Sequence, residues 1–198
     1  MKQGHLFFIM GVSGSGKGTL RDNLQNTYLR DDIVFVLSYV TRAMRPWEVS
    51  GDKYYFVSQE DFLRDVEAWD FLEYEWVHKA GYYGTKKQDV DDGITAWKIV
   101  LSEIDIKWLI QVLEKHPDFR KHFTSFFLDI SDEVIKSRYL ERNPNGCLDD
   151  IRNRLESAQF ERQQAEEYCD YIIDATQSPE VVLEEVIALI EHVWSFTS

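Results

Sequence analysis

Short apolar runs alternate with amphipathic segments along most of this chain. In the amphipathic segments, apolar residues recur about every three or four positions, as in a helix that covers a core. Continuous apolar runs between such helices are typical of buried strands in a parallel sheet that helices cover on both faces. We therefore predict an α/β fold with strands at residues 5–10, 33–40, 98–104, 123–130 and 169–175, and helices at 19–29, 107–115, 132–142 and 179–194.

Residues 42–97 interrupt this alternation. Aromatic and apolar residues at 51–58 and 71–77 predict two strands, and the segment 59–69 between them has a helical period. The stretch "AGYYGT", residues 80–85, is predicted as a turn because it contains two glycines. We interpret residues 42–97 as an inserted α+β lobe.

A second interruption separates two predicted helices in the last third of the chain. Residues 143–150, "NPNGCLDD", are rich in turn-forming residues and form a candidate mobile lid. We therefore divide a single domain into a core, an inserted lobe and a helical lid. The core takes about residues 1–41, 98–142 and 155–198, the lobe about 42–97, and the lid about 143–154.

The overall charge narrows the possible partners. The 198 residues carry a formal net charge of −13, which argues against nucleic-acid binding because the phosphate backbone needs a positive face. The apolar runs are too short to span a bilayer, and the N-terminus lacks the apolar region of a signal peptide. We therefore expect a cytoplasmic protein without membrane contact. Cys147 and Cys169 match neither a metal spacing nor a disulfide framework, so we expect reduced thiols.

A glycine-rich stretch follows the first predicted strand directly. Gly11, Gly16 and Lys17 have the G-x4-G-K spacing of a phosphate-binding P-loop, between a strand and a helix. Its backbone N–H groups would converge on phosphate oxygens, with Lys17 reaching the β- and γ-phosphates. We expect a nucleoside triphosphate here, although a glycine-rich turn without a ligand is the alternative. The residues assigned to it are Gly11, Val12, Ser13, Gly14, Ser15, Gly16, Lys17, Gly18 and Thr19.

The residue after Lys17 departs from the usual P-loop pattern. Gly18 stands where a hydroxyl residue normally contacts Mg²⁺, and Thr19 follows it. Thr19 is therefore the candidate for metal contact, directly or through water. The alternative is an ordinary residue in the first turn of a helix.

Three further blocks carry a resemblance to a known family. They are S-x-x-x-R-x-x-R-P from Ser38, G-x-x-Y-x-F-V-S from Gly51, and Y-Y-G-T ending at Thr85. In this order behind the P-loop, they resemble guanylate kinases, which transfer a phosphoryl group from ATP to GMP. The resemblance extends from Leu6 to the C-terminal helix. It implies a P-loop NTPase-type parallel sheet flanked by helices, with a monophosphate-binding lobe and a lid. It also implies ATP with Mg²⁺, GMP as the acceptor, and a role in purine nucleotide metabolism.

The resemblance also implies a set of acceptor-binding residues. Planar guanidiniums at Arg42 and Arg45 suit a monophosphate. A carboxylate at Glu73 would accept from guanine N1–H and N2–H₂, and hydroxyls at Ser38 and Thr85 would serve the O6 and N7 edge. Taken singly, each of these residues could equally be a surface or locally bonded side chain. The full set assigned to GMP is Ser38, Arg42, Arg45, Tyr54, Glu73, Tyr83, Thr85, Glu103 and Asp105.

Further roles follow from the same resemblance. Tyr54 and Tyr83 would share the GMP phosphate with the arginines, and Glu103 and Asp105 would lie near the acceptor and the metal. Arginines that flank the lid would close over the γ-phosphate, where catalysis is largely positioning and electrostatics. The residues assigned to catalysis are Lys17, Arg138, Arg142 and Arg154, with Arg152 as an alternative.

Two departures from the family pattern and two other functions stay open. Lys107 and Trp108 stand where relatives commonly have Gln-Gly, and Asn143 replaces the glycine that follows the lid arginine. A kinase for another acceptor, such as a phosphorylated sugar, is one alternative, although it would have no use for the residues that read a base. A scaffold domain that binds protein partners is the other, although such domains usually lose the working P-loop. The oligomeric state is not indicated.

Overall fold

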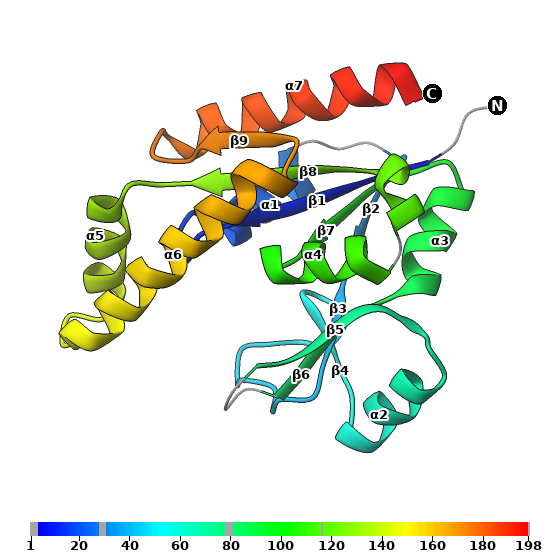
Figure 1. The fold of residues 1–198 in the computed structure, drawn as a ribbon, viewed down its shortest axis with the longest axis horizontal. Helices are drawn as coiled ribbons and strands as arrows, with labels where there is room; N and C mark the ends of the chain where they lie inside the picture. Colours follow the sequence, from blue (N-terminus) through cyan, green and yellow to red (C-terminus); the bar gives the residue numbers. More distant parts are fainter. Residues whose placement is uncertain (1–3, 28–30, 78–80, 116, 198) are drawn as a thin grey trace.

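A five-stranded parallel sheet forms the centre of the larger part of the molecule (Figure 1). The computed structural model describes residues 4–27, 31–77, 81–115 and 117–197. The parallel α/β fold predicted from the alternating pattern is confirmed. In spatial order the strands are β2 (Ile33–Val36), β7 (Ile99–Glu103), β1 (His5–Gly11), β8 (Phe123–Asp129) and β9 (Tyr171–Asp174).

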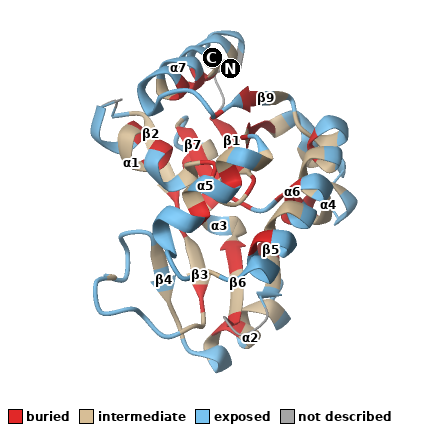
Figure 2. Cartoon of the chain, turned by 90° about the vertical axis from the view of Figure 1, so that its left-hand side faces the viewer, coloured by how far each residue is buried: buried red, intermediate tan, exposed pale blue. Residues whose placement is uncertain are grey.

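Helices cover both faces of this sheet, which explains why its central strands β1, β7 and β8 are buried up to their last residue (Figure 2). In the central strand, Leu6 to Met10 are at most 1% exposed. None of the described helices is long and apolar enough to cross a membrane. The first helices are α1 (Lys17–Thr27), α3 (Lys87–Thr95) and α4 (Ile106–Lys115), followed by the 3₁₀ helix η1 (Pro117–His122). The others are α5 (Asp132–Arg142), α6 (Leu148–Tyr168) and α7 (Pro179–Thr197).

A second sheet lies below the core in Figure 1 and forms the inserted lobe. The helix α2 (Gln59–Glu67) packs on it through Phe62, which is fully buried and stacks on Phe71 with ring centres 4.3 Å apart. The aromatic residues of this region thus form the small core of the lobe. In spatial order its strands are β4 (Tyr54–Phe56), β3 (Ser38–Val40), β6 (Gly81–Lys86) and β5 (Phe71–Val77).

The structure differs from the predicted elements in three places. The apolar run 33–40 splits at Leu37, so its first half pairs in the core sheet and Ser38–Val40 pairs in the lobe sheet. The helix α3 was not predicted. The predicted turn at 80–85 is wrong for residues 81–85, because β6 pairs with both β3 and β5; residue 80 lies outside the described residues. Gly84 instead allows a close approach, since a Cβ there would lie 2.8 Å from the carbonyl oxygen of Glu73.

The lid region is a pair of helices at the left of Figure 1. A turn over residues 143–147 joins α5 to α6, so residues 148–154 are the beginning of the long helix α6. Arg162 holds the two helices at their base by donating to Asp129 at 2.7 Å and Asp132 at 2.8 Å. The division into core, lobe and lid stays a prediction.

Candidate active site

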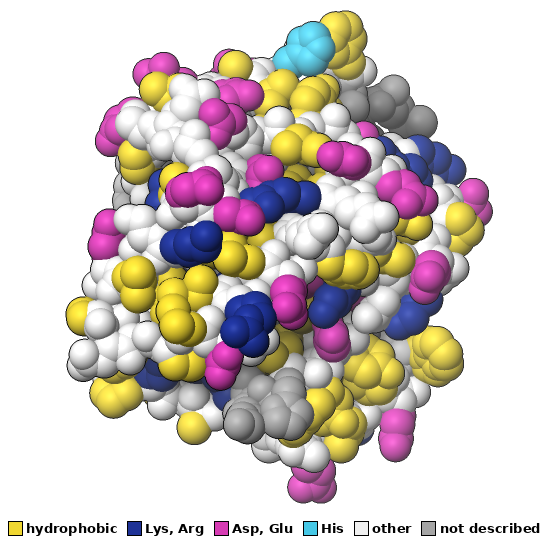
Figure 3. Space-filling model, turned by 60° about the vertical axis from the view of Figure 1, so that its left-hand side comes forward, with side chains coloured by type: hydrophobic (Ala, Val, Ile, Leu, Met, Phe, Trp, Pro, Cys, Tyr) yellow, Lys and Arg dark blue, Asp and Glu magenta, His cyan; other side chains and the backbone are white. Residues whose placement is uncertain are grey.

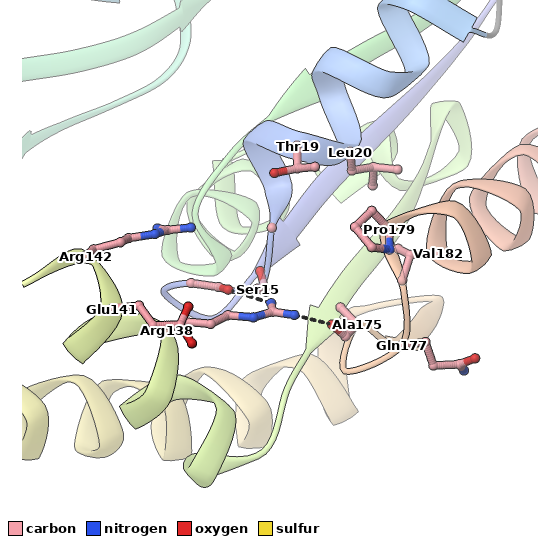
Figure 4. Close-up of a pocket in the computed structure, with 12 residues that line it drawn as sticks. Ser15, Thr19, Leu20, Arg138, Glu141, Arg142, Ala175, Gln177, Pro179 and Val182 are labelled. Carbon is pink, nitrogen blue, oxygen red and sulfur yellow. Dashed lines mark hydrogen bonds between the residues drawn. The ribbon is translucent and has the colours of Figure 1, made fainter.

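Three adjoining cavities form one cleft at the carboxyl ends of the core strands, where ligands bind in open α/β sheets. The first, of about 260 Å³, lies between the glycine-rich loop, α5 and the start of α7 (Figure 4). The middle cavity shares Gly16 and Arg142 with the first. The third, of about 230 Å³, shares Lys17 and Glu103 with the middle one and extends to the inserted lobe. Following the expectation that a nucleoside triphosphate binds at the first and the acceptor at the third, we call the first the donor cavity and the third the acceptor cavity.

The glycine-rich loop joins β1 to α1 in the middle of the cleft. Gly14 and Gly16 have φ angles of 85° and 97°, which favour glycine. Lys17 is the first residue of α1, and its ammonium donates to the carbonyl oxygens of Gly11 and Val12. Burial lowers the pKa of Lys17. The loop therefore presents a helix N-terminus and one lysine to the cleft, which suits an anionic phosphate.

Two lid arginines contact this loop. Arg138 donates to the carbonyl oxygen of Gly14 at 2.8 Å and to that of Ala175 at 3.3 Å (Figure 4). Arg154 donates to the hydroxyl of Ser13. Arg142 is exposed and lines the donor and middle cavities. The alternative Arg152 pairs instead with Asp149 on the surface of α6, with its side chain 68% exposed.

Strand register gathers the predicted base-reading residues. Ser38 pairs with Tyr54, and Glu73 pairs with Thr85. The register that pairs Tyr39 with Gly84 also brings Ser38 beside Thr85. These residues therefore form one row across the four strands of the lobe.

The two ends of this row differ in their surroundings. Ser38 and Tyr54 line the acceptor cavity. Glu73 is 1% exposed and Thr85 fully buried, and their side-chain oxygens have no hydrogen-bond partner among the described residues. Burial raises the pKa of Glu73 to about 8, although the neighbouring Thr85 lowers it in part. Buried polar groups without partners are rare, so this pair has hydrogen-bonding capacity left for a ligand.

The predicted phosphate-binding residues Arg42 and Arg45 follow the end of β3. Arg42 donates to the Tyr83 hydroxyl at 2.9 Å, and both of its terminal nitrogens donate to Glu48 at 2.6 Å. The bidentate contact with Arg42 lowers the pKa of Glu48 to about 2. Arg45 is exposed and contributes its backbone N–H to Glu48 at 2.8 Å. An acceptor phosphate must therefore compete with Glu48 for the guanidinium of Arg42.

The two acids Glu103 and Asp105, at the end of β7 and just beyond it, occupy different environments. Glu103 ends the strand and lines both the middle and acceptor cavities, and burial raises its pKa. Asp105 is exposed, although it also lines the acceptor cavity. Its carboxylate accepts the backbone N–H of Lys107 at 2.9 Å and so caps the start of α4.

Several residues that line the cleft were not predicted from the sequence. Arg21 lines the acceptor cavity, is 8% exposed, and donates to the carbonyl oxygen of Asp52 at 2.8 Å. It follows Lys17 by one helical turn, which is a signal that could have identified it. Lys53 and Trp108 also line this cavity, but no local pattern indicated them. Figure 3 shows Lys and Arg side chains around the middle of one face, with Asp and Glu side chains among them.

The donor cavity holds a further missed group. It comprises four residues at the end of β9 and the start of α7, which Figure 4 shows opposite the loop. A turn directly after a parallel strand lies at the ligand-binding edge of the sheet, so its position was a usable signal. These residues are Ala175, Gln177, Pro179 and Val182.

Comparisons with known proteins point to one family. The sequence profile described as guanylate kinase matches residues 3–193. A guanylate kinase of Helicobacter pylori (strain ATCC 700392 / 26695) is 34% identical over 195 residues, which cover 97% of this chain and 91% of that protein. A guanylate kinase of Thermotoga maritima is 32% identical over 190 residues, covering 95% and 86%. The crystal structure of guanylate kinase from Anaplasma phagocytophilum superposes with a TM-score of 0.72 at 25% identity, covering 98% of this chain and 87% of that one.

Proposed function

Since this chain belongs to the guanylate kinase family, we propose that it transfers the γ-phosphoryl group of ATP to GMP. The products are ADP and GDP, which places the reaction in purine nucleotide metabolism. The observation that carries the proposal is the unpartnered pair of Glu73 and Thr85 on the lobe sheet. Guanine presents two N–H donors on one edge and acceptors on the next, which match a carboxylate and a hydroxyl. A phosphorylated sugar has no such edge, so this pair favours a guanine acceptor.

The donor phosphates bind the glycine-rich loop in this proposal. Backbone N–H groups at the start of α1 and the ammonium of Lys17 supply the positive potential. For Lys17 this means turning from the carbonyl oxygens of Gly11 and Val12 to phosphate oxygens. Arg138 and Arg154 contact the same loop, so their charge lies where negative charge spreads during transfer.

Mg²⁺ enters with ATP in this proposal. The hydroxyl of Thr19 and the carboxylates of Asp22 and Glu103 surround the middle cavity, and such oxygen atoms are the ligands Mg²⁺ prefers. No three His, Cys, Asp or Glu residues in the described ranges gather into a metal site of their own, which suits an ion held largely by substrate phosphates. Thr19 and Glu103 would hold the ion, directly or through water. When bound, it neutralises charge on the β- and γ-phosphate oxygens.

A coupled assay of ADP release tests this function. The acceptors are GMP, dGMP, IMP, AMP and a phosphorylated sugar, each with ATP and Mg²⁺. At a pH above the value of about 8 to which burial raises the pKa of Glu73, where the side chain is ionised, we expect the highest kcat/KM for GMP. The value for AMP should be lower by about 10⁴-fold, because AMP presents a lone pair to the Glu73 carboxylate in a desolvated site. A preference for the sugar phosphate would support the other kinase. Absence of turnover with every acceptor would support the scaffold domain.

The variant Glu73→Gln tests the base-reading residue itself. The amide keeps the size of the side chain but presents one acceptor in place of two, so kcat/KM for GMP falls strongly while that for AMP changes little. The matched control is Glu67→Gln, an exposed acid at the end of α2. If Glu73→Gln leaves the GMP-to-AMP ratio unchanged, Glu73 does not read the base.

A further inference from the structure

Trp108 joins the core to the inserted lobe at the acceptor cavity. It lies in the first turn of α4 and is 7% exposed. Its indole N–H donates to the carboxylate of Glu75 on β5 at 2.5 Å. At the other end of α4, the Lys115 ammonium lies 5.4 Å from the ring centre of Tyr74. The helix α4 therefore contacts β5 from both of its ends.

Glu75 lies on the same face of the lobe sheet as Glu73. The two are separated by one residue on β5 and pair with Tyr83 and Thr85 on β6, and side chains two positions apart in a strand share a face. Two neighbouring carboxylates could both accept from a base. Only one of them is engaged: Glu75 accepts from Trp108, whereas both oxygens of Glu73 lack a partner among the described residues.

The indole ring also has a place in the cavity. Trp108 lines the acceptor cavity together with Ser38 and Tyr83, residues of the lobe sheet, and with Glu103 of the core. The ring of Trp108 therefore forms part of the cavity wall between the core and the lobe sheet. Its N–H is directed to Glu75. A smaller side chain would widen the cavity on the side where Trp108 contacts Glu75, which does not itself line the cavity.

We propose that Trp108 is a positioning residue for acceptor recognition, which holds Glu75 and β5 against α4 and leaves Glu73 as the sole acceptor for the base. The proposal rests on the proposed function and adds to it a residue outside the family pattern. Trp108 has no part in the transfer step, since its polar atom is directed to Glu75 and not to the glycine-rich loop. It acts on the affinity for the acceptor and on the choice of base.

Four variants test the hydrogen bond separately from the ring. Trp108→Phe keeps an aromatic wall but removes the N–H, and Glu75→Leu removes the acceptor. Glu75→Gln keeps an oxygen that can accept from the indole. The double variant Trp108→Phe with Glu75→Leu completes a cycle. Trp76→Phe, a half-exposed tryptophan next to Glu75 on the same strand, is the matched control.

We expect Trp108→Phe to raise KM for GMP by about tenfold, since hydrogen bonds to charged groups contribute on that scale. The GMP-to-AMP ratio of kcat/KM falls, while kcat with GMP and KM for ATP stay within about twofold. Glu75→Leu raises KM for GMP to a similar extent, because β5 loses its hydrogen bond to α4, but it keeps the GMP-to-AMP ratio, because Glu73 is still the carboxylate that accepts from the base. The double variant raises KM no more than Trp108→Phe. Glu75→Gln and Trp76→Phe resemble the wild type.

Two outcomes would overturn the proposal. One is a Trp108→Phe protein with wild-type KM and base preference. The other is a loss in kcat alone, which would place Trp108 in the transfer step. Thermal unfolding checks that each variant is folded, and Glu75→Leu keeps the test open if the core tryptophan cannot be replaced. If the wild type does not phosphorylate GMP, the proposed function fails; if it does and the variants match it, this inference alone fails.

Discussion

The guanidinium of Arg138 on α5 donates a hydrogen bond to the carbonyl oxygen of Gly14 in the glycine-rich loop, at 2.8 Å and across 124 residues of sequence. A second nitrogen of the same group donates to Ala175 at 3.3 Å, beyond β9. One side chain therefore connects the lid, the loop and the far wall of the donor cavity. Its planar fork makes the two contacts through two separate nitrogens, so one side chain reaches two carbonyl oxygens in different segments.

Replacing Arg138 with Lys should lower kcat by about 10²-fold or more, because the single nitrogen of an ammonium does not reproduce the spread of the two guanidinium nitrogens that fix the group beside the loop. Steady-state kinetics with ATP and GMP provide the measurement. Arg152→Lys, on the exposed surface of α6, is the control and should leave kcat unchanged. Equal rates for the two variants would remove Arg138 from the catalytic set.

Lys17→Met should lower turnover by several orders of magnitude and leave GMP binding nearly intact. Lys17 is the lysine of the glycine-rich loop, and its ammonium stabilises charge on the β- and γ-phosphates through transfer. Single-turnover rates and calorimetric titration with GMP measure the two effects separately. Near-normal turnover in this variant would contradict the P-loop assignment.

GMP binding should release a proton at pH 7. Burial raises the pKa of Glu73 to about 8, so the side chain is largely protonated at pH 7 without nucleotide. Two N–H donors from guanine favour the ionised form, so its pKa falls on binding and the proton leaves. The affinity for GMP should accordingly increase as the pH rises toward 8.

Calorimetric titration in buffers of different ionisation enthalpy measures this proton. Glu73→Gln is the control, since it removes the titrating group and leaves the ionisation of the GMP phosphate itself. Proton release of equal size in both proteins would show that Glu73 does not change its protonation state when GMP binds.

Trp69→Gly should stabilise the protein by about 0.5 kcal/mol. Trp69 follows α2 with a φ of 60° and is 79% exposed, a conformation that costs an L-residue about 1–2 kcal/mol. Glycine removes this cost but adds freedom to the unfolded chain, which offsets part of the gain. Urea unfolding measures the difference. Trp69→Ala keeps a Cβ and should show no gain, so equal stability of the two variants would point to another cause.

Several features of this protein were predictable from the sequence because their causes are local. The spacing of apolar residues predicts buried strands between amphipathic helices, because it depends on how many faces of each element are buried. The G-x4-G-K spacing from Gly11 to Lys17 predicted a strand, loop and helix in that order, and the structure has them. The short motifs that follow this loop in the sequence indicated the family, although no contact between their residues was known.

Tertiary pairing decided the remainder. The run 33–40 is apolar except for Ser38, and one polar residue does not show that Leu37 is where the chain leaves one sheet for another. Gly84 predicted a turn by composition, yet it lies in a strand between two partners. The contacts of Trp108 with Glu75 and of Arg138 with Gly14 join residues 33 and 124 positions apart. Such contacts depend on how whole elements pack, and a local pattern of polar and apolar residues carries no information about that.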